Sequence, residues 1–440
     1  MNSFTRRDAI KLIGAAAVSS AGALLVPGGA QAQTLRLKPE KGAQLRVLRW
    51  KRFVRGDEDQ WMKNTQQFTR VTGIPVRVDS ENFEDIRPKA AVAANVGSGP
   101  DIVFGWYDDA HQYPDRTLDV SDVAEYLGAK YGGWYDVCRR YGMRDGRWIC
   151  VPLGIIGGAL VYRQSQVQAA GFEKVPGDLD GFLRLCRALK KNGTPAGMAL
   201  GNAVGDANAW CHWVVWAHGG RMVDENNEVV INSKETIAAL EYAKTLYETF
   251  IPGTLSWLDP NNNKAFLSGD IGLTLNGISI YYAAKTSTDP AMKALAADTQ
   301  HAHLPVGPVG RPTELSPLSP GFVFNFTRYP NAAKEYLRFM MEQEQYGAWQ
   351  QASLGYVQQP LRAYESNPIW TVDPKHTPFR DVPKMILDNG HAGQLGNASA
   401  TTMADYVMVN MVAEAASGAV APQRAARRAE HRARRYYRRR

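Results

Sequence analysis

Three observations on the sequence predict an α/β fold with two structural parts. Its 440 residues exceed the usual length of one domain. Between residues 45 and 105, short apolar runs alternate with amphipathic segments, which is the pattern of βαβ units and a mostly parallel sheet. Helical segments dominate from residue 153 onward, and a Pro/Gly-rich stretch at 304–321 is typical of a crossover between two bodies.

The first body begins with three strands separated by two helices. An alternating run predicts a strand at 45–50, and two further apolar runs predict strands at 74–80 and 101–105. Apolar residues at helical spacing, followed by a glycine, predict a helix at 57–72. A second helix is predicted at 84–99, where two glycines end it.

The later elements are mainly helical. The pattern changes near Val151, where an apolar segment follows a strand that contains a tryptophan. Gly418 and Pro422 mark the start of a terminal helix of alanines and arginines. The remaining predicted elements are helices at 179–191, 207–218, 234–250 and 331–345 and a strand at 322–326.

The net charge of +8 is concentrated at the C-terminus. Residues 424–440 hold nine arginines and one glutamate, whereas residues 33–423 hold 39 basic and 41 acidic residues. A nearly neutral body gives no support to a nucleic-acid partner. The arginine-rich end is open to two interpretations, a solvated terminal helix or a polybasic arm for anionic lipid or polysaccharide, and its composition favours the helix.

The first 32 residues have the features of a cleaved export signal. Arg6 and Arg7 precede an apolar run at 12–26, and an Ala-x-Ala site ends at Ala32. The paired arginines are similar to a twin-arginine signal, which predicts export of the folded chain to the periplasm. No later stretch reaches 18 apolar residues, so no membrane span is predicted.

The four cysteines give no sign of a metal or redox site. Cys138, Cys150, Cys186 and Cys211 lie far apart and form no CxxC or Cys/His ligand spacing. We therefore expect no metal and no cofactor. A bond between Cys138 and Cys150 and free buried thiols both remain open.

Five short motifs carry a resemblance to a known family. They occur in the order FTRVTGIPVRV, GSGPDIVF, WICVPLG, AFLSGDIGLTLNG and PNAAKEYLRFMM. Together they resemble the bacterial extracellular solute-binding proteins of ABC transporters, nearest to the sugar-binding branch that includes maltodextrin-binding proteins. The resemblance spans residues 45–437. It implies a two-lobed periplasmic binding protein fold with a hinge and a central ligand cleft.

The pattern of elements and the resemblance together place the lobe boundaries. The first lobe is expected to comprise residues 41–152 and 306–345. The second is expected to comprise residues 153–305 and 346–440 and to end in the arginine-rich helix.

Candidate ligand-binding residues follow the strands of the first lobe, because open α/β sheets bind ligands beyond the carboxyl ends of their strands. Trp50 follows the first strand, and Glu81 and Asn82 follow the second. Trp106 and Asp108 follow the third, where the resemblance implies an aromatic ring and a carboxylate that contact a sugar. An aromatic ring stacks on the apolar face of a sugar, and a carboxylate bonds its hydroxyls.

Further candidates lie in the second lobe and at the returning strand. Tryptophans in the segment WCHWVVW and before DPNNN are expected to reach the cleft, and an Asn-Gly loop resembles that of the family. Ile156 stands where maltodextrin-binding relatives carry a hinge carboxylate, which argues against that ligand. These further candidates are Trp210, Trp213, Trp257, Asn276, Tyr281, Gly321 and Phe322.

We therefore expect a monomeric periplasmic binding component of an ABC importer, which holds a sugar or polyol and delivers it to the membrane permease. A secreted carbohydrate-active enzyme is the first alternative. Asp108 and Asp109 would be its acids, but neighbours in an extended segment point to opposite faces. A polyamine-binding protein is the second alternative, which Glu81 and the two aspartates favour and Lys51 and Arg52 disfavour.

Overall fold

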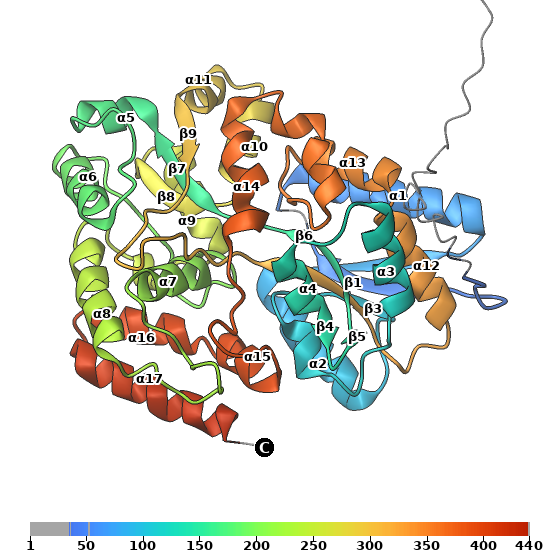
Figure 1. The fold of residues 1–440 in the computed structure, drawn as a ribbon. Helices are drawn as coiled ribbons and strands as arrows, with labels where there is room; N and C mark the ends of the chain where they lie inside the picture. The colour runs from blue at the N-terminus through green and yellow to red at the C-terminus, as the bar shows by residue number, and fades with distance from the viewer. Residues whose placement is uncertain (1–34, 36, 52, 439–440) are drawn as a thin grey trace, which may run out of the picture. The chain divides into compact units, whose positions relative to one another are not determined.

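The computed structural model describes residues 35, 37–51 and 53–438 (Figure 1). The export signal predicted at 1–32 and the role considered for Arg52 lie outside these residues. The described elements belong to one unit that runs from Leu35 to Arg440. None of its described helices has the length and apolarity that a membrane crossing requires.

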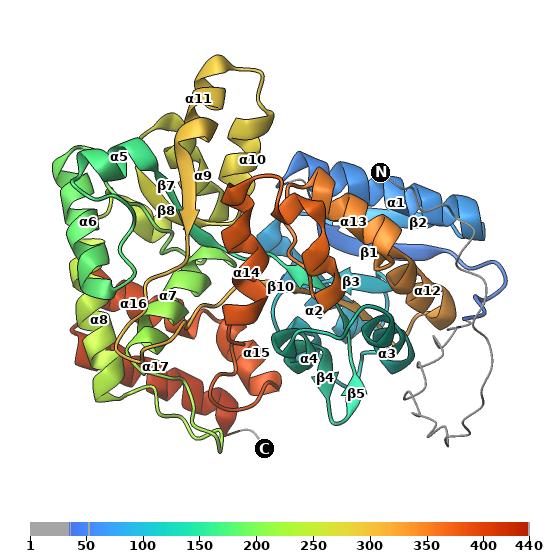
Figure 2. The same cartoon turned by 45° about the horizontal axis from the view of Figure 1, so that its top comes forward.

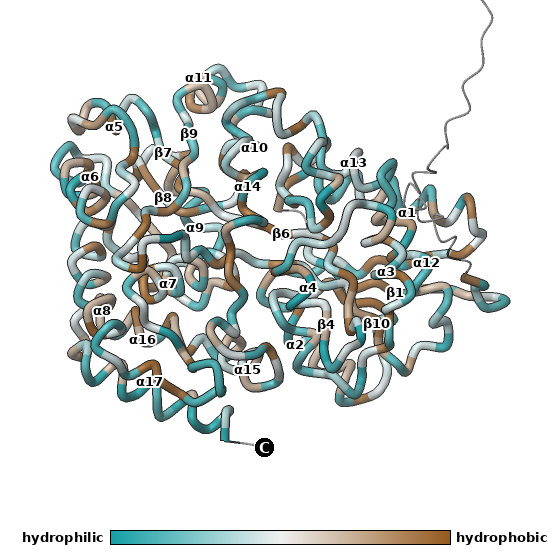
Figure 3. The backbone as a smooth tube through the Cα atoms, in the orientation of Figure 1, coloured by the Kyte–Doolittle hydropathy of each residue, from teal (hydrophilic) through white to brown (hydrophobic). Residues whose placement is uncertain are grey.

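The first sheet has five strands in the order β2-β1-β3-β10-β6. β1 (Leu45–Trp50) pairs in parallel with β2 (Val76–Glu81) and β3 (Ile102–Phe104), as the βαβ pattern predicts. β10 (Leu318–Val323) runs antiparallel to both β3 and β6 (Val151–Ile155). Apolar residues are concentrated in this sheet, where Figure 3 shows brown segments near β1 and β10, and the buried Arg49 of β1 is an exception.

β10 begins within the stretch that the sequence predicts to be a crossover. The predicted strand at 322–326 begins four residues after β10 does, because prolines and glycines before residue 322 favour a loop. Pro320 lies where the register with β6 shifts, and a β-bulge is one of the few places where an inner strand accommodates proline. The crossover therefore ends before Leu318.

Helices flank the first sheet on both faces (Figures 1 and 2). A short hairpin, β4 (Met143–Arg144) and β5 (Arg147–Trp148), accompanies them. The helices are α1 (Arg55–Thr72), α2 (Phe83–Val96), α3 (Ser121–Lys130), α4 (Asp136–Gly142), α12 (Pro330–Met340) and α13 (Gln343–Ala352).

α13 belongs with the first sheet, although the sequence places residues after 345 in the second lobe. The Trp349 indole N–H donates to Asp57 Oδ1 on α1 at 2.7 Å. Its ring centroid lies 4.8 Å from that of Trp61, also on α1. The tryptophan contacts thus hold α13 against α1. The other lobe boundaries stay predictions.

The second sheet has three antiparallel strands in the order β8-β7-β9. They are β7 (Ala159–Arg163), β8 (Leu273–Asn276) and β9 (Thr299–Ala302). The chain passes from the first sheet to this one at 156–158 and returns at 303–317. The helices between these passages are α5 (Gln164–Ala169), α6 (Leu179–Lys191), α7 (Asp206–Ala217), α8 (Lys234–Tyr247), α9 (Asp259–Ser268), α10 (Ser279–Thr286) and α11 (Pro290–Asp298).

The C-terminal segment returns to the second sheet's helices. The predicted terminal helix is confirmed as α17, which packs on α8, α15 and α16 (Figures 1 and 2). Short 3-10 turns lie at Asp109–Gln112, Thr254–Ser256, Arg362–Ser366, Pro368–Trp370 and Pro374–His376. The helices of the segment are α14 (Thr377–Met385), α15 (Asn397–Ala404), α16 (Val407–Ala416) and α17 (Pro422–Tyr437).

Candidate functional site

A cavity lies where the elements of the two sheets meet, and we call it the central cavity. Strand ends and helix starts form it: Phe53 follows β1, Phe83 follows β2, and Asn276 ends β8. Its free volume is about 30 Å³, roughly the share of one water molecule in the liquid. Its other lining residues are Ile156, Gly158, Gly205, Asp206, Ala209, Asp259, Gly277, Ser279, Pro317 and Tyr356.

Two carboxylates from different helices meet at this cavity. Asp206 is the first residue of α7, and Asp259 is the first residue of α9. Asp259 Oδ1 accepts the backbone N–H of Asp206 at 2.8 Å and that of Gly205 at 3.1 Å. Asp206 Oδ2 accepts the side-chain amide of Asn262 at 2.6 Å. Neither carboxylate forms an ion pair with a lysine or arginine among the described residues.

Burial changes the protonation of this pair. It raises the pKa of Asp259 to about 6, although the backbone donors favour the charged form. Burial raises the pKa of Asp206 well above its usual range, and the neighbouring Asp259 raises it further. Burial and the closeness of the two carboxyl groups therefore disfavour two negative charges on this pair and favour a proton held by the pair. The pair can accept hydrogen bonds from hydroxyl groups and also donate one.

Amides and a hydroxyl extend the polar side of the cavity. The Asn276 amide donates to Asn263 Oδ1 at 2.7 Å and to Ser279 Oγ at 3.0 Å. The Asn262 amide also donates to the Leu275 carbonyl at 2.9 Å. This network fixes the side chains before any solute arrives.

Three aromatic rings form the apolar side. The ring centroids of Phe53 and Phe83 are 5.3 Å apart. Those of Phe53 and Tyr356 are 6.3 Å apart, and the two planes are within 13° of parallel. A cavity with acids on one side and ring faces on the other suits a solute with hydroxyl groups and an apolar face.

Two hydrogen bonds beside the cavity join elements of the first sheet to elements of the second. The Tyr107 hydroxyl, after β3, donates to the Val204 carbonyl before α7 at 3.1 Å. The backbone N–H of Gly56 on α1 donates to the Tyr282 hydroxyl on α10 at 2.8 Å. A solute larger than water requires the walls of the cavity to separate, and these bonds beside the cavity oppose that separation.

Comparison with known families decides the identity of the fold. The profile of the bacterial extracellular solute-binding protein family matches residues 63–378, which is more than half of the chain. The chain belongs to this family. A comparison with curated protein sequences gives no match.

Solved structures share the fold of this solute-binding protein. The GacH receptor of Streptomyces glaucescens, whose structures include an acarbose complex, aligns with a TM-score of 0.75 at 16% identity over 90% of this chain and 99% of that one. Maltose-bound MalE3 of T. maritima aligns at 0.76 and 16% identity over 89% and 99%. A ribitol complex of an Agrobacterium radiobacter ABC transporter solute-binding protein aligns at 0.74 and 19% identity over 90% and 100%. The predicted two-lobed fold is therefore confirmed.

Trp50 and Trp106 lie behind the aromatic wall of the solute-binding protein. Both are fully buried. The Trp106 ring stacks on Phe83 at 4.2 Å between centroids, and its indole N–H donates to the Phe83 carbonyl at 3.0 Å. The Trp50 indole N–H donates to Asp57 Oδ2 at 3.0 Å. In this structure the two tryptophans support Phe83 rather than line the cavity.

Asp108 and Asp109 do not lie in an extended segment, and this corrects the geometry that we expected. Asp109 begins a 3-10 turn, because the chain bends after β3. Asp108 Oδ2 accepts from the Asn389 amide and the Ser399 hydroxyl, both at 2.7 Å. Asp109 Oδ1 accepts from Arg87 Nε at 2.6 Å. Burial raises the pKa of Asp108 to about 7.

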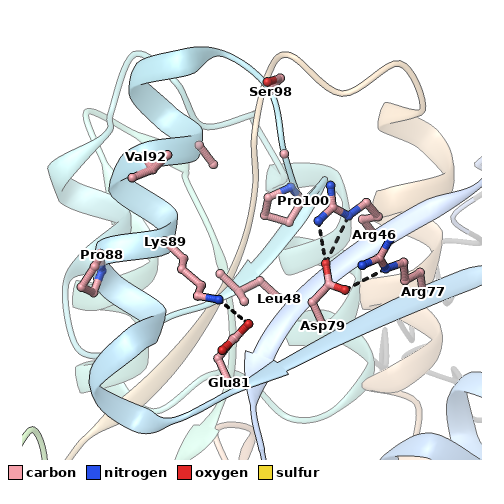
Figure 4. Close-up of a pocket in the computed structure, with 12 residues that line it drawn as sticks. Arg46, Leu48, Arg77, Asp79, Glu81, Pro88, Lys89, Val92, Ser98 and Pro100 are labelled. Carbon is pink, nitrogen blue, oxygen red and sulfur yellow. Dashed lines mark hydrogen bonds and ion pairs between the residues drawn. The ribbon is translucent and has the colours of Figure 1, made fainter.

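Glu81 lies at a separate surface pocket beside β2, drawn in Figure 4. It pairs with Lys89, and the neighbouring Asp79 pairs with Arg46 and Arg77 at 2.7 and 2.8 Å. The Asn82 amide, close by, donates to Asp85 at 2.9 Å. These polar side chains therefore all have hydrogen-bond or ion-pair partners at the edge of the first sheet.

Trp210, Trp213 and Tyr281 are buried, whereas Trp257 is partly exposed. The indole N–H groups of Trp210 and Trp213 donate to the carbonyls of Ala199 and Pro305 at 2.6 and 2.9 Å. The Tyr281 hydroxyl donates to Asp373 at 2.5 Å. Trp257 packs over Gly197, and Gly321 and Phe322 are buried within β10.

Of the twelve candidates, only Asn276 lines the central cavity in this structure. Contact of the other eleven with a bound solute stays a prediction. None of the other twelve lining residues was a candidate. Five of them carry the chemistry described above, and no local motif links the two acids, which begin different helices. These five residues are Phe53, Phe83, Asp206, Asp259 and Tyr356.

The cysteines of the described chain are all free and buried, Cys138 and Cys150 included. Burial raises the pKa of the Cys138 thiol, which keeps it protonated. Among the described residues no three histidine, cysteine or acidic side chains converge as a metal ion requires.

Proposed function

We propose that this chain is the binding component of an ABC importer and that it holds a small sugar or polyol in the central cavity. The proposal rests on one observation: the Asp206–Asp259 pair and three aromatic rings line the same cavity. It is supported by similar folds whose structures contain acarbose, maltose and ribitol. These three ligands carry many hydroxyl groups and suit such a lining.

The mechanism uses binding and closure, and no bond of the solute is broken. Asp259 accepts a solute hydroxyl, Asp206 donates to or accepts from another, and Phe53 stacks on the ring. Closure of the lobes around the solute excludes water and strengthens these bonds. The permease then recognises the closed form. Export through the twin-arginine route and a monomeric state complete the proposal.

A small organic cation is a second candidate. The absence of an ion pair at Asp206 and Asp259 within the described part of the chain favours it, because an ammonium group would neutralise the negative charge of this pair. Aromatic faces also attract cations. The solute screen below separates the two candidates.

The test is a thermal-shift screen of sugars, polyols and polyamines, followed by titration calorimetry of each hit. We expect a sugar or polyol to raise the Tm. Asp206→Asn should weaken its binding about 10- to 100-fold, because a hydrogen bond to a charged or shared-proton carboxyl is lost. Asp136→Asn is the matched control: this exposed carboxylate does not line the central cavity, so affinity should stay unchanged.

Three outcomes would contradict the proposal in different ways. If only polyamines raise the Tm, the solute is a cation. If Asp206→Asn and Asp136→Asn bind the hit equally well, the central cavity is not the site. If the chain converts a bound sugar into a product, the protein is an enzyme.

A further inference from the structure

The outer face of α17 is a continuous stripe of basic side chains, which we call the arginine stripe. It consists of Arg424, Arg427, Arg428, His431, Arg435 and Arg438, and all six residues are exposed. At about 100° per residue, the six positions fall within roughly 100° of the helix circumference. No acidic or apolar residue of α17 lies within that arc. The stripe is about 21 Å long at 1.5 Å per residue.

The opposite face of α17 fixes the direction in which the stripe points. Ala425, Ala426, Ala429 and Ala433 are buried. They pack against α8, α15 and α16, which lie beside α17 in both views (Figures 1 and 2). Small side chains let the helix approach its neighbours closely, so it cannot rotate without exposing this face. The arginines are therefore held on a rigid surface and directed away from the protein.

Most of the stripe's charge is not neutralised within the protein. Arg428 pairs with Glu414 at 3.1 Å. Arg434, at the edge of the stripe, pairs with Glu430 at 2.7 Å. The side chains of Arg424, Arg427, Arg435 and Arg438 form no hydrogen bond or ion pair with any described residue.

We propose that the arginine stripe docks the protein on an anionic phospholipid surface. Guanidinium groups bind phosphate through two parallel hydrogen bonds, and clustered arginines are attracted to anionic lipid headgroups. A protein partner fits less well, because interfaces need an apolar core and this arc contains none. A nucleic acid would fit the charge, but an exported chain does not meet it.

The consequence for transport rests on the proposed function. An importer is embedded in the membrane, so a binding protein that adheres weakly to lipid is concentrated near its permease. The central cavity does not include any residue of α17. Lipid docking and solute binding are therefore separable by experiment.

The test is flotation of the purified chain with vesicles that contain about 30 % phosphatidylglycerol in phosphatidylcholine, at low salt. We expect binding to these vesicles and none to pure phosphatidylcholine. The variant R424Q/R427Q/R435Q/R438Q should bind about 600-fold more weakly, since each of the four arginines contributes about 5-fold. Raising the salt to about 0.5 M should abolish binding, because ions screen the charges.

The matched control R70Q/R184Q/R187Q/K191Q removes four exposed basic residues from α1 and α6 instead. It should bind the vesicles like the unaltered chain, and both variants should keep the unaltered Tm and solute affinity. Equal losses in the two variants would show a general charge effect and overturn the proposal. Binding to a DNA duplex as tight as binding to the vesicles, at the same salt, would also overturn the proposal. Failure of solute binding alone would contradict only the proposed function.

Discussion

At the scale of single residues, Asp57 is the anchor of a buried polar cluster. Arg49 and Asp57 are both fully buried and pair at 2.8 Å. Asp57 also accepts the indole N–H groups of Trp50 and Trp349. Asp57→Ala leaves a buried guanidinium and two indole donors without partners. We expect a loss of about 3–5 kcal/mol in the free energy of unfolding, measured by urea denaturation.

The control for Asp57 is Asp136→Ala. Asp136 pairs with Arg362 at 3.5 Å, but its side chain is 93% exposed. Solvent screens such a pair, so the free energy of unfolding should hardly change. Equal losses from the two substitutions would mean that the buried cluster is not the cause.

Asp108 gives a second residue-scale prediction, on the pH dependence of stability. Burial raises its pKa to about 7 from an ordinary 3.8. The folded chain thus binds an extra proton between these two values, and the free energy of unfolding falls as pH rises through that window. The slope from one such group is up to about 1.4 kcal/mol per pH unit.

Asp108→Asn cannot titrate, so its stability relative to the unaltered chain should improve from about pH 4 to pH 7 and stay constant above. Urea denaturation at several pH values measures this difference. The change in slope is the signature, because loss of acceptors for Asn389 and Ser399 alone would shift the curve without tilting it. Parallel curves for the two proteins would refute the prediction.

At the scale of elements, most of α7 lies in the core, and only its first turn lines the cavity. Trp213 is fully buried, and its indole N–H bonds the Pro305 carbonyl. Trp213→Phe removes this bond and leaves a small void, which should cost about 1–3 kcal/mol. Solute affinity should change less than about 2-fold, since α7 reaches the cavity only through its first turn. Urea denaturation and calorimetry measure the two effects, and a large affinity loss without destabilisation would contradict this placement.

Helices with local signals were predictable from sequence. The predicted helix at 179–191 matches α6, because Asp178 caps it through the Gly181 N–H at 2.8 Å and its apolar spacing is regular. The predicted helix at 331–345 is instead broken between α12 and α13. Glu342 lies at the break and bonds Lys130 at 2.7 Å. That partner is distant in sequence, so no local pattern reveals the break.

The lining of the site was harder to predict than the helices. Asp206 and Asp259 lie 53 residues apart, and only the meeting of the first turns of α7 and α9 brings them together. The tryptophans of α7 show a second limit of local sequence patterns. Three indoles in one helix were expected to be too costly to bury, yet backbone carbonyls accept the N–H groups of Trp210 and Trp213. Motif order reveals the fold, whereas the cavity depends on contacts between distant segments.

At the scale of the whole molecule, the balance between closed and open lobes sets solute affinity. The Tyr107–Val204 bond joins the two sides of the cavity, so it stabilises the closed form. Tyr107→Phe removes a bond worth about 1 kcal/mol. The closed population should fall, and the apparent Kd should rise up to about 5-fold.

Tyr113→Phe is the matched control, because the buried Tyr113 hydroxyl has no hydrogen-bond partner among the described residues. Calorimetry measures the affinities, and small-angle scattering without solute should give a larger radius of gyration for Tyr107→Phe alone. An unchanged radius together with equal affinity in both variants would show that this bond does not control closure.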